Sequence, residues 1–410
     1  MDEILAELTA IQMRIARATP TAFRRFLHGS INWNAPLITI TGGRGTGKST
    51  LVMQHFLQEE KDPSKCLYIS ADNPLALKEG LYALGTAFFK LGGERLLVDE
   101  VHKQTEWSVQ IKALFDAFPG RRGVLLGSSR LELLSQKGDL SRRTLIYDLK
   151  PMSFREFLNL KHGLELPSFS MEEVLSDHVR IASSLADMPV RPVADFEEYL
   201  QRGCLPIFPL YSGDEYHQIL SNLIDKVIYE DVPALRDVRN ASSVALKKLL
   251  AFLAMSKIPS LVVSSLCGEI GVTRETLYIL LDLLERADLI NIVRPEKKGV
   301  RAARGTRILF AHPNMYFCVA GELWRHSAER GNIRESFFAS QMKGLYEFHS
   351  SETVDYTVRL PSGRTIGVEI GGPGKGKKQL QKEGDGFVFR DRTEVGFGNI
   401  VPLWMAGFLY

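Results

Sequence analysis

The sequence has 410 residues, too many for one ordinary hydrophobic core, and its length predicts roughly two to four domains. Hydrophobic residues make up 45% and charged residues 24%, the balance of a water-soluble globular protein. A net charge of +3 excludes nucleic-acid binding through bulk charge, so any such contact needs a local basic patch.

The four cysteines lie far apart, without the close spacing of a zinc site or a redox pair, which favours free thiols in a reducing cytoplasm. The N-terminal segment is amphipathic and lacks the layout of a signal peptide. The longest apolar stretch, 249–272, is interrupted by Lys257, Pro259 and Glu269. We therefore predict a cytoplasmic protein without a membrane span.

A glycine-rich motif follows the apolar, β-branched run 35–41, which predicts a buried parallel strand. The motif GGRGTGKST fits G-x-x-x-x-G-K-S/T and precedes a helix-like segment, the context of a phosphate-binding loop. Glycines let main-chain amides face phosphates, Lys48 would bind the β- and γ-phosphates, and the Ser49 hydroxyl would ligate Mg²⁺. We therefore expect ATP and Mg²⁺ to bind at Gly42, Gly43, Arg44, Gly45, Thr46, Gly47, Lys48, Ser49 and Thr50.

A second motif, RLLVDE, is an apolar strand at 95–98 that ends in Asp99 and Glu100. Its position about fifty residues after the phosphate loop predicts the Walker B arrangement. Asp99 would hold Mg²⁺ through its water shell, and Glu100 would polarise the attacking water. The alternative, for an acidic pair taken alone, is a solvated strand end.

Three more strands are predicted at 66–71, 122–127 and 144–149. Five strands separated by helical segments indicate an α/β fold, a mainly parallel sheet with helices on both faces. A strand between the phosphate loop and Walker B favours the P-loop ATPases that use a catalytic glutamate. Ser128 or Ser129, after the fourth strand, could sense the γ-phosphate or simply cap the next helix.

Four motifs, GGRGTGKST, LLVDEVHK, LLGSSRLELL and GDLSRRTLIYDLKPMSFREFL, occur in this order and resemble a group of prokaryotic AAA+-type ATPases. The resemblance runs nearly the full length, and the C-terminal half of that group is largely of unknown function. It implies an arginine before the fifth strand, Arg143 or else Arg142, that reaches a neighbour's γ-phosphate in a homo-oligomer. The alternative is a surface arginine at a helix C-terminus.

Residues 152–240 are expected to be helical, and the resemblance implies a helical lid there. Ser153 is a predicted helix cap. The stretch 167–192 is rich in polar residues and proline and predicts a loop or an insertion.

Residues 241–320 have the pattern of a winged helix, with a turn at Gly271-Val272 between two short helices. The second helix should bury Leu277, Leu280, Leu281 and Leu284. The wing that follows carries one acid, Glu296, and a basic patch suited to DNA phosphates, although the unit could instead bind protein. The basic residues of this wing are Arg294, Lys297, Lys298, Arg301, Arg304 and Arg307.

The last block, 321–410, resembles the PD-(D/E)-x-K nuclease-like module that often ends this family. Glu335, Asp355 and Glu369 match the three carboxylate positions, but Gly371 stands where the lysine belongs. On a glycine-rich loop farther along come Lys375, Lys377 and Lys378, whose geometry the sequence does not define. We expect an inactive remnant that binds DNA or a partner, because a nuclease of this kind needs a positioned lysine.

The sequence therefore predicts an AAA+-type ATPase that acts as a switch or motor, with DNA contact through the wing Arg294–Arg307. The alternatives are a regulatory ATPase whose C-terminal domains bind protein only, and an ATP-gated, metal-dependent nuclease. The predicted parts are an N-terminal helical segment (1–31), a P-loop core (32–151), a helical lid (152–240), a winged helix (241–320) and a nuclease-like domain (321–410).

Overall fold

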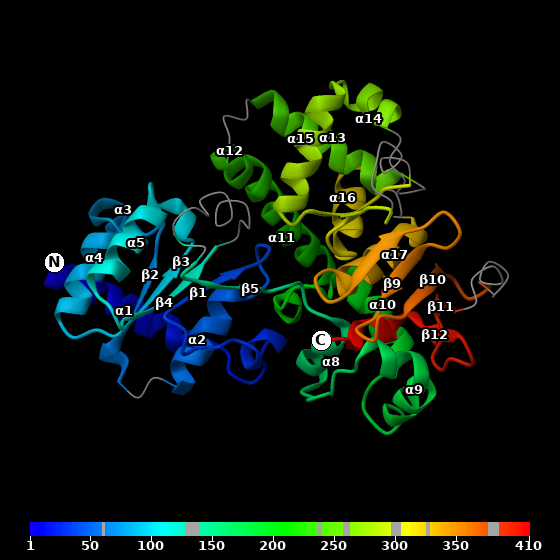
Figure 1. Ribbon diagram of the computed structural model, residues 1–410, viewed down its shortest axis with the longest axis horizontal. Coiled ribbons are helices and arrows are strands. Elements are labelled where there is room, and N and C mark those ends of the chain that lie inside the picture. The colour runs from blue at the N-terminus through cyan, green and yellow to red at the C-terminus, as the bar shows by residue number, and fades with distance from the viewer. Residues whose placement is uncertain are drawn as a thin grey trace. The chain divides into compact units, whose positions relative to one another are not determined.

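The computed structural model consists of two compact units, Met1–Lys150 and Pro151–Tyr410 (Figure 1). The structure describes residues 1–59, 62–127, 140, 142–235, 240–256, 263–296, 305–324, 329–375 and 385–410. No helix within these ranges is long and apolar enough to cross a membrane.

A five-stranded sheet forms the centre of the first unit, and its strands follow the order β2-β3-β4-β1-β5. All neighbouring strands pair in parallel. Each of the five predicted strands is confirmed to within two residues at either end. The strands are β1 (Leu37–Thr41), β2 (Cys66–Ser70), β3 (Arg95–Asp99), β4 (Arg122–Leu126) and β5 (Leu145–Asp148).

Helices cover both faces of this sheet. Successive side chains of a strand point to opposite faces and therefore enter two different cores. Leu96 and Val98 of β3 pack into one core, while Leu97 between them packs into the other. Each of these three side chains is at most 2% exposed, and burying one such side chain contributes roughly 1.5–3 kcal/mol. The helices are α1 (Asp2–Ala18), α2 (Lys48–Glu59), α3 (Pro74–Glu79), α4 (Leu81–Lys90) and α5 (Trp107–Ala117).

Strand order brings the two predicted motifs together at one edge of the sheet. β1 and β3 both pair with β4 and run in the same direction. The glycine loop after β1 and the acidic pair at the end of β3 therefore leave the sheet at its carboxyl edge. Ligands of open parallel sheets bind at this edge.

The second unit begins with helices, as expected for 152–240, but the predicted loop at 167–192 is wrong. It contains α9, whose N-cap Ser170 forms a capping box with Glu173. This reciprocal pair of hydrogen bonds satisfies the free amides at the helix start. The helices here are α8 (Phe154–His162), α9 (Met171–Ser184), α10 (Pro192–Arg202), α11 (Gly213–Lys226) and α12 (Val232–Leu235).

Three helices and a β-hairpin follow, the element order that a winged helix requires. Leu277, Leu280, Leu281 and Leu284 are each at most 3% exposed, which confirms the predicted buried face. Assignment as a winged helix stays a prediction. The elements are α13 (Asn240–Met255), α14 (Val263–Ile270), α15 (Arg274–Arg286) and the antiparallel strands β6 (Ile290–Val293) and β7 (Arg307–Phe310).

The remaining chain forms a second five-stranded sheet, of order β12-β11-β10-β9-β8, next to α17 (Figure 1). The terminal residue returns to the start of the unit, where the Ser153 hydroxyl donates to the Tyr410 carbonyl at 3.0 Å. The predicted lid and the predicted C-terminal block thus share one compact unit. These elements are α16 (Asn314–Trp324), α17 (Arg330–Met342), β8 (Glu347–Ser350), β9 (Tyr356–Arg359), β10 (Thr365–Gly371), β11 (Gly386–Arg390) and β12 (Ile400–Pro402).

Candidate nucleotide-binding site

The loop between β1 and α2 has a backbone that only glycine can adopt at its start. Gly42 has φ of 144°, and a Cβ atom there would collide with the Leu149 carbonyl. Gly45 and Gly47 are left-handed, with φ of 80° and 93°. Such turns expose main-chain amides, which is what a phosphate cradle requires.

Lys48, the first residue of α2, folds back over this loop. Its ammonium donates to the carbonyls of Gly42 at 2.7 Å and Gly43 at 2.9 Å, and the residue is 7% exposed. Phosphate oxygens carry full charge and bind an ammonium more strongly than neutral carbonyls do, so the Lys48 ammonium could move from these two carbonyls to a phosphate. The loop residues therefore fit an anionic ligand.

Asp99 and Ser49, the two predicted Mg²⁺ residues, are in direct contact: the Ser49 hydroxyl donates to the Asp99 carboxylate. The hydroxyl of Tyr68 on β2 donates to the same oxygen at 2.8 Å, and the Glu100 amide donates to the other at 2.8 Å. Burial and then the charge of Asp99 raise the pKa of Tyr68, so its phenol stays a donor. An oxygen-rich site of this kind suits Mg²⁺.

Tyr68 was not foreseen from the sequence. The available signal was a tyrosine inside a strand otherwise built of buried residues, because a buried phenol normally needs a hydrogen-bond partner. Arg25 was also missed. It is 5% exposed, and its guanidinium donates to the carbonyls of Thr46, within the loop, and Lys150.

Glu100 follows β3 in a left-handed conformation, with φ of 47°. One carboxylate oxygen lies 3.5 Å from a guanidinium nitrogen of Arg44, within the glycine loop. The other lies 3.3 Å from Nε2 of His102. The predicted water-positioning carboxylate therefore stands beside the phosphate loop, with a basic side chain near each of its oxygens.

The structure does not test the predicted roles of the two serines and two arginines of this unit. Ser128 and Ser129 lie outside the described residues. Arg143 is half-exposed and forms an ion pair with Asp116 of α5, while Arg142 is exposed. Action of either arginine on a neighbouring subunit stays a prediction.

In the second unit, the three acids predicted from the nuclease-like pattern surround Arg307 and Lys375. The Arg307 guanidinium pairs with Glu335 of α17 and with Asp355, the latter at 3.1 Å. Tyr356 donates its hydroxyl to Glu335 at 2.8 Å, and Arg307 lies over its ring, 4.8 Å from the centroid. Strand β7 thus supplies a cation to this acidic pair.

Lys375 fills the space that Gly371 leaves. A Cβ atom on Gly371 would collide with Cβ and Cγ of Lys375, and the Lys375 ammonium lies 2.6 Å from the Glu369 carboxylate. Burial raises the pKa of Glu369 and that of Glu335. Within the described ranges, no three His, Cys, Asp or Glu side chains are arranged to hold a metal ion.

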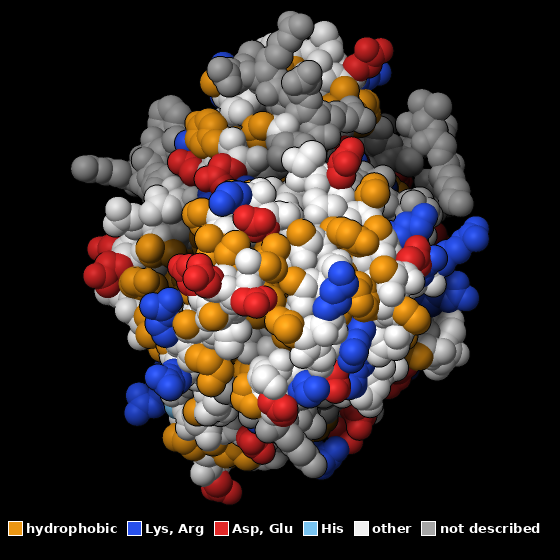
Figure 2. Space-filling view, turned by 90° about the vertical axis from the view of Figure 1, so that its left-hand side faces the viewer, with side chains coloured by type: hydrophobic (Ala, Val, Ile, Leu, Met, Phe, Trp, Pro, Cys, Tyr) orange, Lys and Arg blue, Asp and Glu red, His pale blue; other side chains and the backbone are white. Residues whose placement is uncertain are grey.

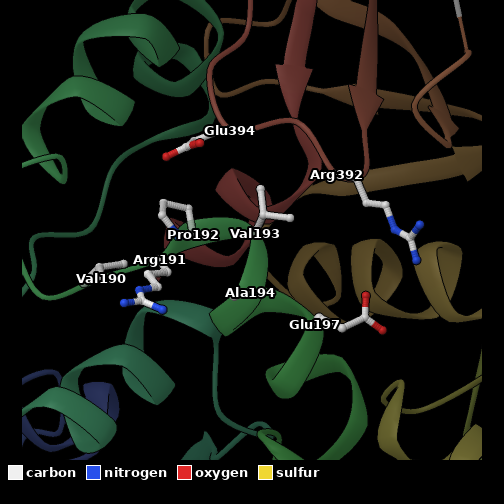
Figure 3. A pocket seen from close by; sticks show the side chains of 8 residues that line it. All are labelled: Val190, Arg191, Pro192, Val193, Ala194, Glu197, Arg392 and Glu394. Carbon is white, nitrogen blue, oxygen red and sulfur yellow. The ribbon is translucent and has the colours of Figure 1, made fainter.

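A separate pocket of about 550 Å³ lies at the start of α10 (Figure 3). Its charged lining residues are Arg191, Glu197, Arg392 and Glu394, and Glu197 is ion-paired with Arg330. It contains no residue predicted as a functional site from the sequence.

Residues 34–158 match the sequence profile of the AAA domain family. The matched range covers most of the first unit, and this similarity supports nucleotide binding and ATPase activity in general. Residues 193–321 match the profile of a domain of unknown function, DUF8612. The predicted resemblance is thus confirmed for the P-loop part and stays a prediction for the winged helix and the nuclease-like region.

Among curated proteins, an uncharacterized protein of Methanocaldococcus jannaschii is 30% identical over 271 residues, which are 63% of this chain. The match spans 57% of that relative's length. Aeropyrum pernix Orc1 in complex with DNA has a TM-score of 0.31 and 12% identity, covering 80% of this chain and 91% of that chain. AMPPCP-bound DnaA of Aquifex aeolicus has a TM-score of 0.28 and 16% identity, covering 68% and 88%. Similarities at this level say nothing of what this chain binds.

Proposed function

We propose that this chain binds ATP with Mg²⁺ on the loop Gly42–Thr50 and hydrolyses it. The observation that carries the proposal is the contact between Ser49 and Asp99 beside a glycine loop that exposes its amides. Two motifs fifty residues apart in sequence meet at the carboxyl edge of one sheet. This is the arrangement that phosphoryl transfer by P-loop proteins requires.

Each residue has a defined task in this proposal. The loop amides and Lys48 hold the phosphates, and Ser49 and Asp99 hold Mg²⁺ directly or through water. When bound, Mg²⁺ would neutralise charge on the phosphates. Glu100 orients the attacking water for in-line displacement.

Two substitutions test this. Lys48→Ala should abolish the rise in melting temperature that Mg-ATP produces in the unmodified chain, because it removes the phosphate-binding cation. Glu100→Gln should keep that rise but hydrolyse ATP roughly 100-fold more slowly, because it keeps the shape and loses the carboxylate. Thermal unfolding with and without Mg-ATP, together with phosphate release, measures both effects. Normal hydrolysis by Glu100→Gln would overturn its role, and an unmodified chain indifferent to Mg-ATP would overturn the function itself.

A second candidate is DNA contact through the wing Arg294–Arg307, which its basic composition favours. Arg294 is exposed and paired with Glu285, while Arg307 is engaged by the acids described above. On the face that Figure 2 shows, basic and acidic side chains are interspersed. With a net charge of only +3, phosphate binding would need a local basic patch. The contact would therefore depend on the four wing residues outside the described ranges, Lys297, Lys298, Arg301 and Arg304.

A further inference from the structure

Arg44 contacts the residue that the proposed reaction needs most. It stands between Gly43 and Gly45, in the loop that would surround the phosphates, and its side chain is 10% exposed. Its guanidinium lies 3.5 Å from one Glu100 oxygen. His102, 2% exposed, lies 3.3 Å from the other. One Glu100 oxygen thus lies beside a residue of the phosphate loop, and the other lies beside a residue that follows its own strand.

We propose that Arg44 is a positioning residue with two partners: Glu100 when no nucleotide is bound, and the terminal phosphate of ATP when it is. This inference rests on the function proposed above. A phosphate group carries about −1.5 to −2 charges near neutral pH, against −1 for a carboxylate. The Arg44 guanidinium therefore binds the phosphate in preference to Glu100. The exchange frees one Glu100 oxygen for water, and the other oxygen stays beside His102.

The exchange makes Arg44 the residue that distinguishes ATP from ADP. ADP has no γ-phosphate, so it leaves the pair between Arg44 and Glu100 intact. ATP binding has to break that pair, and Glu100 therefore competes with ATP for Arg44. Hydrolysis becomes possible only when the triphosphate itself has released the carboxylate.

The test is a double-mutant cycle of Arg44→Ala and Glu100→Gln. Calorimetry measures the affinity of each of the four proteins for ATP and for ADP. In the chain that keeps Arg44, Glu100→Gln should tighten ATP binding roughly five- to tenfold, because it removes the competing charge. In the Arg44→Ala background the same change should alter ATP affinity less than about twofold. ADP affinity should vary by less than about threefold across all four proteins. Arg44→Gln serves as a second variant if Arg44→Ala does not fold, and Arg14→Ala on the exposed side of α1 is the matched arginine control.

Equal tightening of ATP binding in both backgrounds would overturn the inference, because it would mean that Glu100 only repels nucleotide charge. Equal effects on ATP and ADP would overturn it as well. Neither result affects the proposed function, which fails only if the unmodified chain binds or hydrolyses no ATP.

Discussion

The predicted Mg²⁺ residue of the first unit and the predicted nuclease-like acids of the second differ in what holds their carboxylate oxygens. Asp99, in the first unit, is held by neutral donors: the hydroxyls of Ser49 and Tyr68 and a main-chain amide. A divalent ion can replace such partners at small cost, because a neutral hydrogen bond contributes only about 0.5–1.5 kcal/mol net. If the proposed function is correct, these neutral partners would give way to a metal that arrives with the nucleotide.

The acids of the second unit are held by cations from the chain itself. Arg307 pairs with Glu335 and Asp355, and Lys375 pairs with Glu369. A metal could enter between Glu335 and Asp355 only by displacing a partly buried guanidinium, and breaking a buried ion pair costs about 3–5 kcal/mol. The same acidic residue types thus serve two purposes, and the neighbouring cations decide which.

Removal of Arg307 should produce the largest effect that follows from this difference. Arg307→Ala leaves Glu335 and Asp355 facing each other without a cation and should lower the free energy of unfolding by about 3–5 kcal/mol. Arg294→Ala is the matched control, because its exposed pair with Glu285 should contribute less than about 1 kcal/mol. Urea denaturation of the full chain, followed by circular dichroism, measures both. Equal losses in the two variants would mean that Arg307 is an ordinary surface arginine.

The glycine loop offers the next largest effect. Gly42→Ala should cost at least about 2 kcal/mol, because it forces a left-handed φ and a collision with the Leu149 carbonyl. Nucleotide affinity should fall roughly tenfold or more, since the loop amides would shift. Gly29→Ala is the control: its Cβ would meet no atom within 4 Å, and we expect less than about 0.5 kcal/mol. Calorimetric titration with Mg-ATP and thermal unfolding test both, and a Gly42→Ala chain with unchanged affinity would contradict the proposed cradle.

The first unit was well predicted from the sequence because its signals are local. Runs of buried, β-branched residues define the strands, and the two motifs are contiguous. α9 was missed because its polar and proline-rich surroundings suggested a loop, although Ser170 and Glu173 have the spacing of a capping box. That spacing was the stronger signal.

The contacts that complete each site could not be predicted, because they join residues far apart in sequence. Tyr68 reaches Asp99 across 31 positions, and Arg307 reaches Asp355 across 48. Lys375 was noted in the sequence, but only the fold shows that its side chain occupies the space beside Gly371. A motif search that tests only position 371 therefore finds no lysine, although Lys375, four residues after that position, reaches Glu369.

Lys375 gives the smallest effect and one that depends on pH. Lys375→Ala should cost about 1–2 kcal/mol at pH 7.5, because Glu369, 2% exposed, loses its cation. Burial already raises the pKa of Glu369 above 4.5, and losing the ammonium raises it further. Between 4.5 and that raised pKa the folded variant binds more protons than the unfolded chain, so its deficit should shrink as pH falls towards 5. Lys375→Ala combined with Glu369→Gln should show no such pH dependence, and urea denaturation at both pH values decides. A deficit equal at both would mean that Lys375 contributes packing over Gly371 rather than charge.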